Sequence, residues 1–193
     1  MNFITQMITQ QIAGYAARAV AQRLGISEAT AQRAVMVAVP LIVAALARNA
    51  ARPGGAQELH QAVTTDHDGS ILDNLPGYLD DPRAANGAGI LGHVFGGQQG
   101  AVQNTVAQAT GLDPNAAGSI LEIVAPLVMG AVGQTARQNE LDPGGLSDFL
   151  DTQRQQTEAA APGLTGALNS VLDSNHDGSV TDDLGRLLGT FFK

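Results

Sequence analysis

Two stretches of this 193-residue sequence decide its fold: VAQRLGISEATAQRAVMVAVPLIVAALARNA at residues 20–50, and VAQATGLDPNAAGSILEIVAPLVMGAVGQTA at residues 106–136. They align without a gap at an offset of 86 residues, and nine aligned positions carry the same amino acid. In the long apolar part, an apolar residue of one stretch mostly aligns with an apolar residue of the other. A self-similarity of this length is typical of a duplicated structural unit.

Each stretch predicts a long helix that begins at a sharp corner. Ser27 and Asp113 occupy matched positions just before the apolar run, and both residue types are favourable N-caps. Gly25 and Gly111 stand two residues earlier, where glycine suits the end of a preceding helix. We therefore expect a helix, a tight corner and a long apolar helix in each copy.

A proline lies inside each long helix, Pro40 in the first and Pro126 in the second. Proline inside a helix removes a backbone hydrogen bond and costs about 3 kcal/mol, so we expect a kink at the same place in both copies. No run of alternating apolar residues predicts a strand. The expected fold class is all-α, with two related helical units, kinked helices and EF-hand-like loops.

The match between the copies continues beyond the long helices at shifted offsets. It divides the chain near residue 97 into a first unit at 1–97 and a second unit at 98–193. The matched pieces are RPGG at 52–55 with DPGG at 142–145, TTDHDGSILDNL at 64–75 with DSNHDGSVTDDL at 173–184, and LGHVF at 91–95 with LGTFF at 188–192.

The loop at residues 173–184 resembles the loop by which an EF-hand holds calcium. Calcium takes six to eight oxygen ligands, and such a loop supplies them from alternate positions around a sharp turn at a sixth-position glycine, here Gly178. Leu184 replaces the usual closing Glu, so we expect Asp182 to close the loop and the affinity to be weak, roughly 10⁻⁵–10⁻³ M. The candidate ligands are Asp173, Asn175, Asp177, Ser179, Asp182 and Asp183.

The loop at residues 64–75 is a poorer version of the same pattern, because its first position offers only a hydroxyl. Its candidate ligands are Thr64, Asp66, Asp68, Ser70 and Asp73. Both DGS segments are also ordinary turn chemistry, in which Asp or Asn bonds its own backbone and Gly turns the chain. Metal-free turns in a structural or assembly protein are therefore the alternative. His67 and His176 fall at the fourth position, which points away from the cation, so we expect no transition metal.

Residues 20–35 also resemble a helix-turn-helix of bacterial regulators. In that interpretation Glu28, Thr30, Gln32 and Arg33 face the major groove of DNA. The net charge of −8 opposes it, because DNA binding needs clustered Lys and Arg. The matched second copy has no basic residue at these positions, so a DNA-binding regulator is the less favoured alternative and no nucleic-acid partner is expected.

The remaining signals exclude most other classes. The chain has no cysteine, which rules out disulfides and thiolate sites. The segment GGQQG at residues 96–100 lacks the Lys-Ser/Thr ending of a phosphate loop, so we expect no enzyme.

The start of the chain shows no secretion signal, which favours a cytoplasmic protein, with another export route left open. The apolar run at residues 34–47 is shorter than the roughly 20 residues that span a bilayer and predicts a buried core helix, not a membrane span.

Four segments together are similar to a known family: LGISEATAQRAVMVAVPLIVAAL, DHDGSILDNL, GAGILGHVF and DSNHDGSVTDDLGRLLG. In this order they resemble the bacterial domain of unknown function 937, to which the YidB-like proteins belong, over residues 15–95 and 100–192. The resemblance implies a soluble helical bacterial protein without an assigned activity, and it supplies no catalytic residues. We therefore expect a non-enzymatic helical protein that binds calcium weakly and presents an interaction or self-assembly surface to a second copy of itself or to another protein.

Overall fold

The computed structural model describes residues 15–160, and every regular element in this range is a helix, as the sequence predicts. The elements in chain order are α2 (Tyr15–Leu24), α3 (Glu28–Ala50), α4 (Gly55–Thr65), α5 (Ser70–Asp73), α6 (Leu75–Asp80), the 3-10 helix η1 (Pro82–Ala85), α7 (Gly87–Phe95), the 3-10 helix η2 (Gly96–Gln98), α8 (Gln99–Thr110), α9 (Pro114–Gln138) and α10 (Pro143–Ala160).

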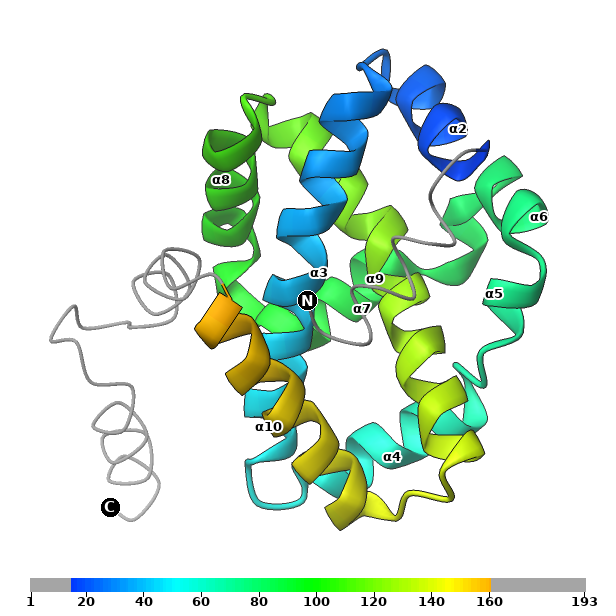
Figure 1. The fold of residues 1–193 in the computed structure, drawn as a ribbon, viewed down its shortest axis with the longest axis vertical. Helices are drawn as coiled ribbons and strands as arrows, with labels where there is room; N and C mark the ends of the chain where they lie inside the picture. Colours follow the sequence, from blue (N-terminus) through cyan, green and yellow to red (C-terminus); the bar gives the residue numbers. More distant parts are fainter. Residues whose placement is uncertain (1–14, 161–193) are drawn as a thin grey trace, which may run out of the picture.

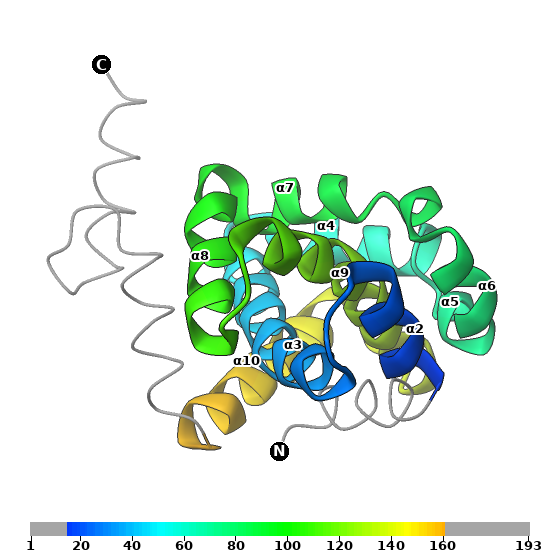
Figure 2. The ribbon, with the colours of Figure 1, turned by 90° about the horizontal axis from the view of Figure 1, so that it is seen from above.

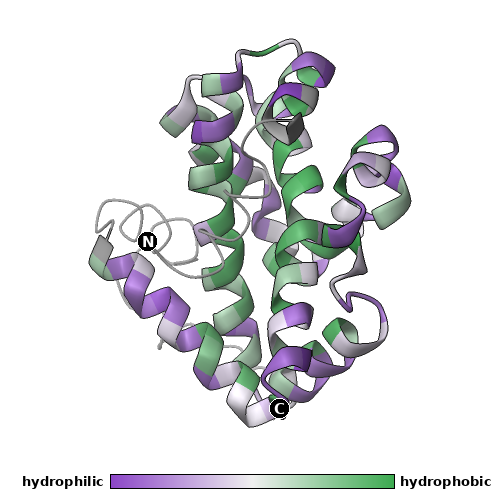
Figure 3. Cartoon of the chain, turned by 45° about the vertical axis from the view of Figure 1, so that its right-hand side comes forward, coloured by the Kyte–Doolittle hydropathy of each residue, from purple (hydrophilic) through white to green (hydrophobic). Residues whose placement is uncertain are grey.

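The two long helices predicted from the repeat, α3 and α9, pack against each other at the centre of the molecule (Figure 1). Seen from above, the shorter helices surround this pair (Figure 2). Apolar residues concentrate along α3 and α9, while the outer helices carry most of the polar residues (Figure 3). The repeated apolar stretch therefore supplies the core of the protein.

Small side chains make up much of this core. Ala34, Ala38 and Ala45 of α3 and Ala125 and Ala131 of α9 are completely buried. Small residues let helix backbones approach closely, so the alanine-rich composition is used for packing inside the chain. These alanine faces are therefore covered by the protein's own helices.

Both halves of the sequence contribute to one hydrophobic core. Helix α4 packs on α9 as well as on α3, and α10 packs on α3 and on α4. The boundary expected near residue 97 falls in η2, between helices that share this core. The units at 1–97 and 98–193 stay a prediction about sequence repeats, because their described helices interleave.

The corners that begin the long helices match each other in detail. Ser27 precedes α3 with an extended backbone, and its side chain accepts the Thr30 backbone N–H at 3.1 Å. Asp113 precedes α9 with nearly the same backbone angles and accepts the N–H groups of Asn115 at 3.0 Å and Ala116 at 3.1 Å. The N-cap predictions for both helices are confirmed.

The turns just before these caps also correspond. Gly25 and Gly111 have φ of +66° and +73°, in the left-handed region that favours glycine. In the first corner the backbone N–H after the glycine donates to the Ala21 carbonyl at 2.9 Å, and in the second it donates to the Ala107 carbonyl at 3.1 Å. Each of these backbone hydrogen bonds reaches back past the glycine to the last turn of the preceding helix, a pattern that ends many helices.

The helices continue through Pro40 and Pro126, and both prolines are buried. Proline at position 126 has no N–H to donate to the carbonyl four residues earlier, that of Glu122. Gly87, the first residue of α7, lies against this carbonyl so closely that a Cβ at Gly87 would be 1.9 Å from its oxygen. The start of α7 thus lies against the α9 carbonyl that has no helical N–H partner.

The next carbonyl of α9 is held from a different element. The buried Tyr78 hydroxyl of α6 donates to the Ile123 carbonyl at 2.6 Å. Burial raises the pKa of this phenol far above its ordinary value, so the side chain stays a donor. Tyr78 thus joins α6 to α9 at the carbonyl next to the one that Gly87 contacts.

By length and hydropathy alone, α3 and α9 could each cross a membrane. Their most apolar windows are 67% and 83% buried inside the protein, which is the environment of core helices. The run at 34–47 is buried apart from Met36 and Val37, in agreement with the predicted core helix.

Candidate functional site

The first DGS loop connects α4 to α5 and begins on the last turn of α4. The Thr64 hydroxyl donates to the carbonyls of His60 at 2.8 Å and Gln61 at 3.2 Å, so it bonds to its own helix. Asp66 is the C-cap residue of α4, and its backbone N–H donates to the Ala62 carbonyl at 3.0 Å. The first two candidate ligands thus belong to the end of a helix.

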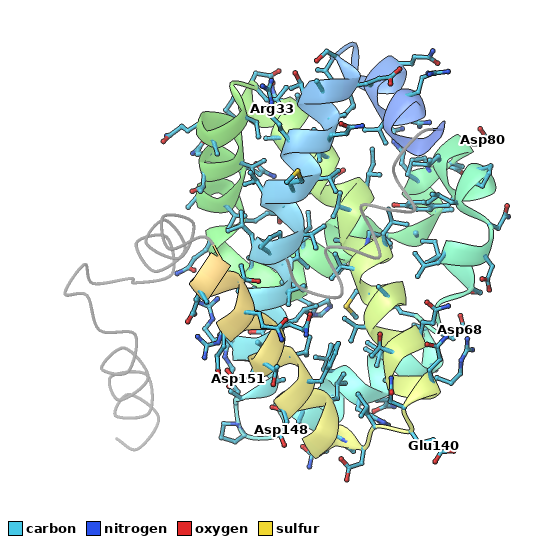
Figure 4. The ribbon with its side chains drawn as sticks, in the orientation of Figure 1. Arg33, Asp68, Asp80, Glu140, Asp148 and Asp151 are labelled. Carbon is cyan, nitrogen blue, oxygen red and sulfur yellow. The ribbon has the colours of Figure 1, made fainter. Side chains whose placement is uncertain are left out.

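The middle of the loop has the geometry of a turn. One oxygen of Asp68 accepts the Ser70 backbone N–H at 3.0 Å, and the other lies 3.8 Å from the Arg137 guanidinium of α9 (Figure 4). The hydrogen bond from Ser70, and to a smaller extent the Arg137 charge, hold the pKa of Asp68 below its ordinary value. Asp73 falls in the following helix, α5.

The structure therefore brings Asp68 and Ser70 into direct contact and distributes the other candidates over α4 and α5. Within residues 15–160, no three His, Asp or Glu side chains converge in a way that could hold a metal ion. The described hydrogen bonds of this loop are those of a glycine turn that follows a helix end.

The backbone of the loop is seated on α9. A Cβ at Gly133 of α9 would lie 1.9 Å from the His67 carbonyl oxygen, and a Cβ at Gly130 would lie 2.6 Å from Cγ2 of Ile71. Gly69, buried in the middle of the loop, has φ of +96°, which strains any other residue. The DGS loop is thus a glycine turn that fits against two glycines of the central helix.

The second DGS loop lies outside the described residues. Its predicted ligands stay a prediction from the sequence: Asp173, Asn175, Asp177, Ser179, Asp182 and Asp183.

The α2–α3 corner has the helix-turn-helix form that the sequence suggested, and its polar groups bond to one another. The Glu28 carboxylate accepts a hydrogen bond from the guanidinium of the exposed Arg18 at 2.9 Å, so the two opposite charges are paired. Arg33 is exposed near the start of α3 (Figure 4) and donates to the Thr30 hydroxyl at 3.3 Å. Beyond this corner α3 runs directly into the core, as expected from its apolar sequence.

A cavity of about 550 Å³ opens where the end of α3, the length of α4 and the face of α7 meet. Its wall is fixed by Asn49 of α3, whose amide donates to the Val94 carbonyl near the end of α7 at 3.0 Å. The polar side chains that line it come from three separate elements and the loop: Asn49, Arg52, Glu58, Asp66, His67, Asn86 and His93.

His67 lies half-buried on this wall. Burial lowers its pKa below the ordinary value, and the carboxylate of Asp66 opposes part of that effect. The side chain is therefore uncharged at neutral pH. The formal charges of the lining are then two carboxylates, Glu58 and Asp66, and one guanidinium, Arg52.

Sequence reasoning missed this cavity because its lining residues are ordinary types with no fixed spacing. One signal was present: the cavity is lined by residues from DHDGS and from GAGILGHVF, two of the segments that carry the family resemblance. The same loop that predicts a calcium site thus contributes Asp66 and His67 to a different feature.

Comparison with known proteins gives one match. The model of a family described as bacterial protein of unknown function (DUF937) matches residues 6–135. Neither the curated proteins nor the solved structures contain a match to the chain.

Proposed function

The chain belongs to the bacterial family of unknown function DUF937, and from this premise we propose that it is a non-enzymatic, duplicated helical protein with two different DGS loops. The loop at 64–75 is a structural turn that fixes α4 and α5 on α9. The loop at 173–184 is a weak calcium site that ties the ends of its flanking segments together. The close contact of the first loop with Gly130 and Gly133 is the observation that supports different roles for the two loops.

The duplication is supported by more than sequence identity. The two corners share their capping residue, their positive-φ glycine and the hydrogen bond that closes the turn. The next pieces also correspond, because α4 begins at the last residue of RPGG, Gly55, and α10 begins within DPGG, at Pro143. A three-helix unit, α2–α3–α4 and α8–α9–α10, accounts for these matches.

The second loop is the better calcium candidate because its donors differ from those of the first. Asp173 stands where the first loop has Thr64, and Asn175 stands where it has Asp66. A carboxylate at the first position supplies a charged ligand oxygen, whereas the Thr64 hydroxyl is neutral and donates to its own helix. The absent bidentate Glu keeps the expected dissociation constant at roughly 10⁻⁵–10⁻³ M.

Thermal melts of the full chain with calcium, magnesium or a chelator test this proposal. With a dissociation constant of about 0.1 mM, 10 mM calcium adds about 2.7 kcal/mol to the free energy of unfolding. For a chain of this size, that corresponds to about 5–10 °C in Tm. Magnesium should give a smaller shift, because it requires a near-ideal octahedron.

The duplicated loops provide a matched pair of variants. Asp177→Asn in the second loop should abolish the calcium shift, whereas Asp68→Asn at the matched position of the first loop should lower the baseline Tm and leave the shift intact. An unchanged Tm of the wild type in calcium would reject the calcium site. A shift lost in Asp68→Asn and kept in Asp177→Asn would place the site in the first loop instead.

The proposal also includes a cytoplasmic location and an interaction role with a second copy or another protein. The alanine faces of α3 and α9 are buried within the chain, so such contacts would use other surfaces. Light scattering of the purified chain at several concentrations decides between monomer and homo-oligomer.

A further inference from the structure

We infer that the cavity between α3, α4 and α7 is a binding site for a small, largely apolar organic molecule that carries a cationic group. Its volume of about 550 Å³ lies within the 300–1,000 Å³ typical of small-molecule sites. This inference is independent of the calcium proposal, because none of the cavity's residues belongs to the second DGS loop.

Part of the cavity lining is apolar. Leu46 of α3, Leu59 of α4, Val94 of α7 and Met129 of α9 line it, and each is at least nine-tenths buried. A ligand with an apolar body would remove its own apolar surface from water against these side chains, which is the main driving force for such binding. Polar side chains complete the lining, and apolar surface with a few polar groups is usual for a small-molecule site.

The charges of the lining select a cation. Glu58 and Asp66 both belong to the α4 side, eight residues apart and thus about 12 Å along the helix axis. Asp66 caps the C-terminal end of α4, where the helix dipole adds negative potential. Arg52 lies before the other end of α4, so it leaves the Asp66 end free for a positive group. The net charge of −8 also concentrates cations near the protein.

The walls are fixed before any ligand arrives. Asn49 joins the end of α3 to α7 through its bond to the Val94 carbonyl. The His67 backbone is held against Gly133, so the Asp66–His67 corner cannot shift without moving α9. A ligand therefore binds without opening the core, and the ordering cost of binding is small.

Fluorescence titration of the full chain with berberine, a small aromatic cation that brightens in apolar surroundings, tests the site. The titration is done in the presence of a chelator, so calcium does not contribute. We expect a saturable signal, with the anion 1-anilinonaphthalene-8-sulfonate binding at least tenfold more weakly. Ala62→Phe, which places a ring in the cavity from α4, should weaken berberine binding at least tenfold. Gln61→Phe, on the exposed neighbouring position outside the cavity, should leave it unchanged.

A second pair of variants tests the charge assignment without filling the cavity. Glu58→Gln combined with Asp66→Asn should weaken berberine at least fivefold and leave the anion unchanged or bound more tightly. Glu140→Gln combined with Asp148→Asn, two exposed carboxylates outside the cavity (Figure 4), is the charge-matched control and should have no effect. The inference is overturned if berberine gives no saturable signal, or if Ala62→Phe, shown to be folded by circular dichroism, binds it like the wild type. Tighter binding of the anion than of the cation would overturn the ligand class.

Discussion

The glycines of α9 show how single residues decide where a distant loop attaches. Gly133 leaves room for the His67 carbonyl, and a side chain there would collide with fixed backbone, not with a flexible neighbour. The sequence predicted the loop but not the surface on which it packs. No local signal indicates that a loop near residue 67 contacts a helix near residue 133. Glycine is otherwise unfavourable inside a helix by about 1 kcal/mol. The contacts of Gly130 and Gly133 with the DGS loop explain why glycine stands at these two positions of α9.

Gly133→Ala should destabilise the protein by about 1–3 kcal/mol, because the added methyl group overpacks the contact with the loop backbone. Gly92→Ala in α7 is the matched control, since a Cβ there meets no atom within 4 Å. That control should be neutral or stabilising by up to about 1 kcal/mol. Urea denaturation of the three proteins measures the difference, and equal stabilities would show that the loop does not rest on Gly133.

Tyr78 joins α6 to α9 through one buried hydrogen bond, which a single substitution can remove. Tyr78→Phe keeps the ring but removes the donor to the Ile123 carbonyl, which leaves a buried acceptor without that bond. The expected loss of unfolding free energy is about 1–3 kcal/mol. Chemical denaturation of the wild type and the variant measures this loss. An unchanged unfolding free energy would mean that the hydroxyl contributes nothing.

His67 gives the stability a pH dependence with a definite sign. Burial lowers its folded-state pKa below the ordinary value of about 6.5, so the unfolded chain takes up a proton first as the pH falls. Its contribution is therefore present above pH 6.5 and is lost as the pH falls from 6.5 toward the folded pKa. His67→Gln should flatten the decrease in Tm between pH 7.5 and 5.5, and an identical pH profile in that variant would contradict the assignment.

At the scale of elements, the helices with strong local signals were predictable from the sequence. The cap, the glycine corner and the apolar period located the starts of α3 and α9, because each of these signals acts within a few residues. The short elements between Ser70 and Phe95 were not predictable in detail, since their positions depend on contacts with α9. The cavity was unpredictable for the same reason, because its wall combines α3, α4 and α7.

The matched caps should contribute comparably to the two central helices. Ser27→Ala and Asp113→Ala each remove a side-chain acceptor from backbone N–H groups of the first turn. Each should lower the unfolding free energy by about 1 kcal/mol, and the double variant should lose about the sum, because the sites are independent. Chemical denaturation measures all three variants, and a loss at only one site would separate the two corners energetically.

At the scale of the whole molecule, the interleaving of α4 with α9 and of α10 with α3 predicts cooperative folding. A fragment of residues 1–97 lacks the partner that covers α4, and it exposes the apolar face that α3 presents to α9. We expect this fragment to lose the cooperative thermal transition that the full chain shows by circular dichroism. A sharp melt of the fragment alone would instead establish the two units as separate domains.

Pro126 has a consequence for how this chain can vary during evolution. Its missing N–H leaves the Glu122 carbonyl exposed to the approach of Gly87, and the neighbouring Ile123 carbonyl accepts from Tyr78. A relative that replaces this proline regains an N–H for the Glu122 carbonyl and releases the constraint on Gly87. Positions 87 and 126 should therefore change together among related sequences, as one inherited pair and not as two separate substitutions.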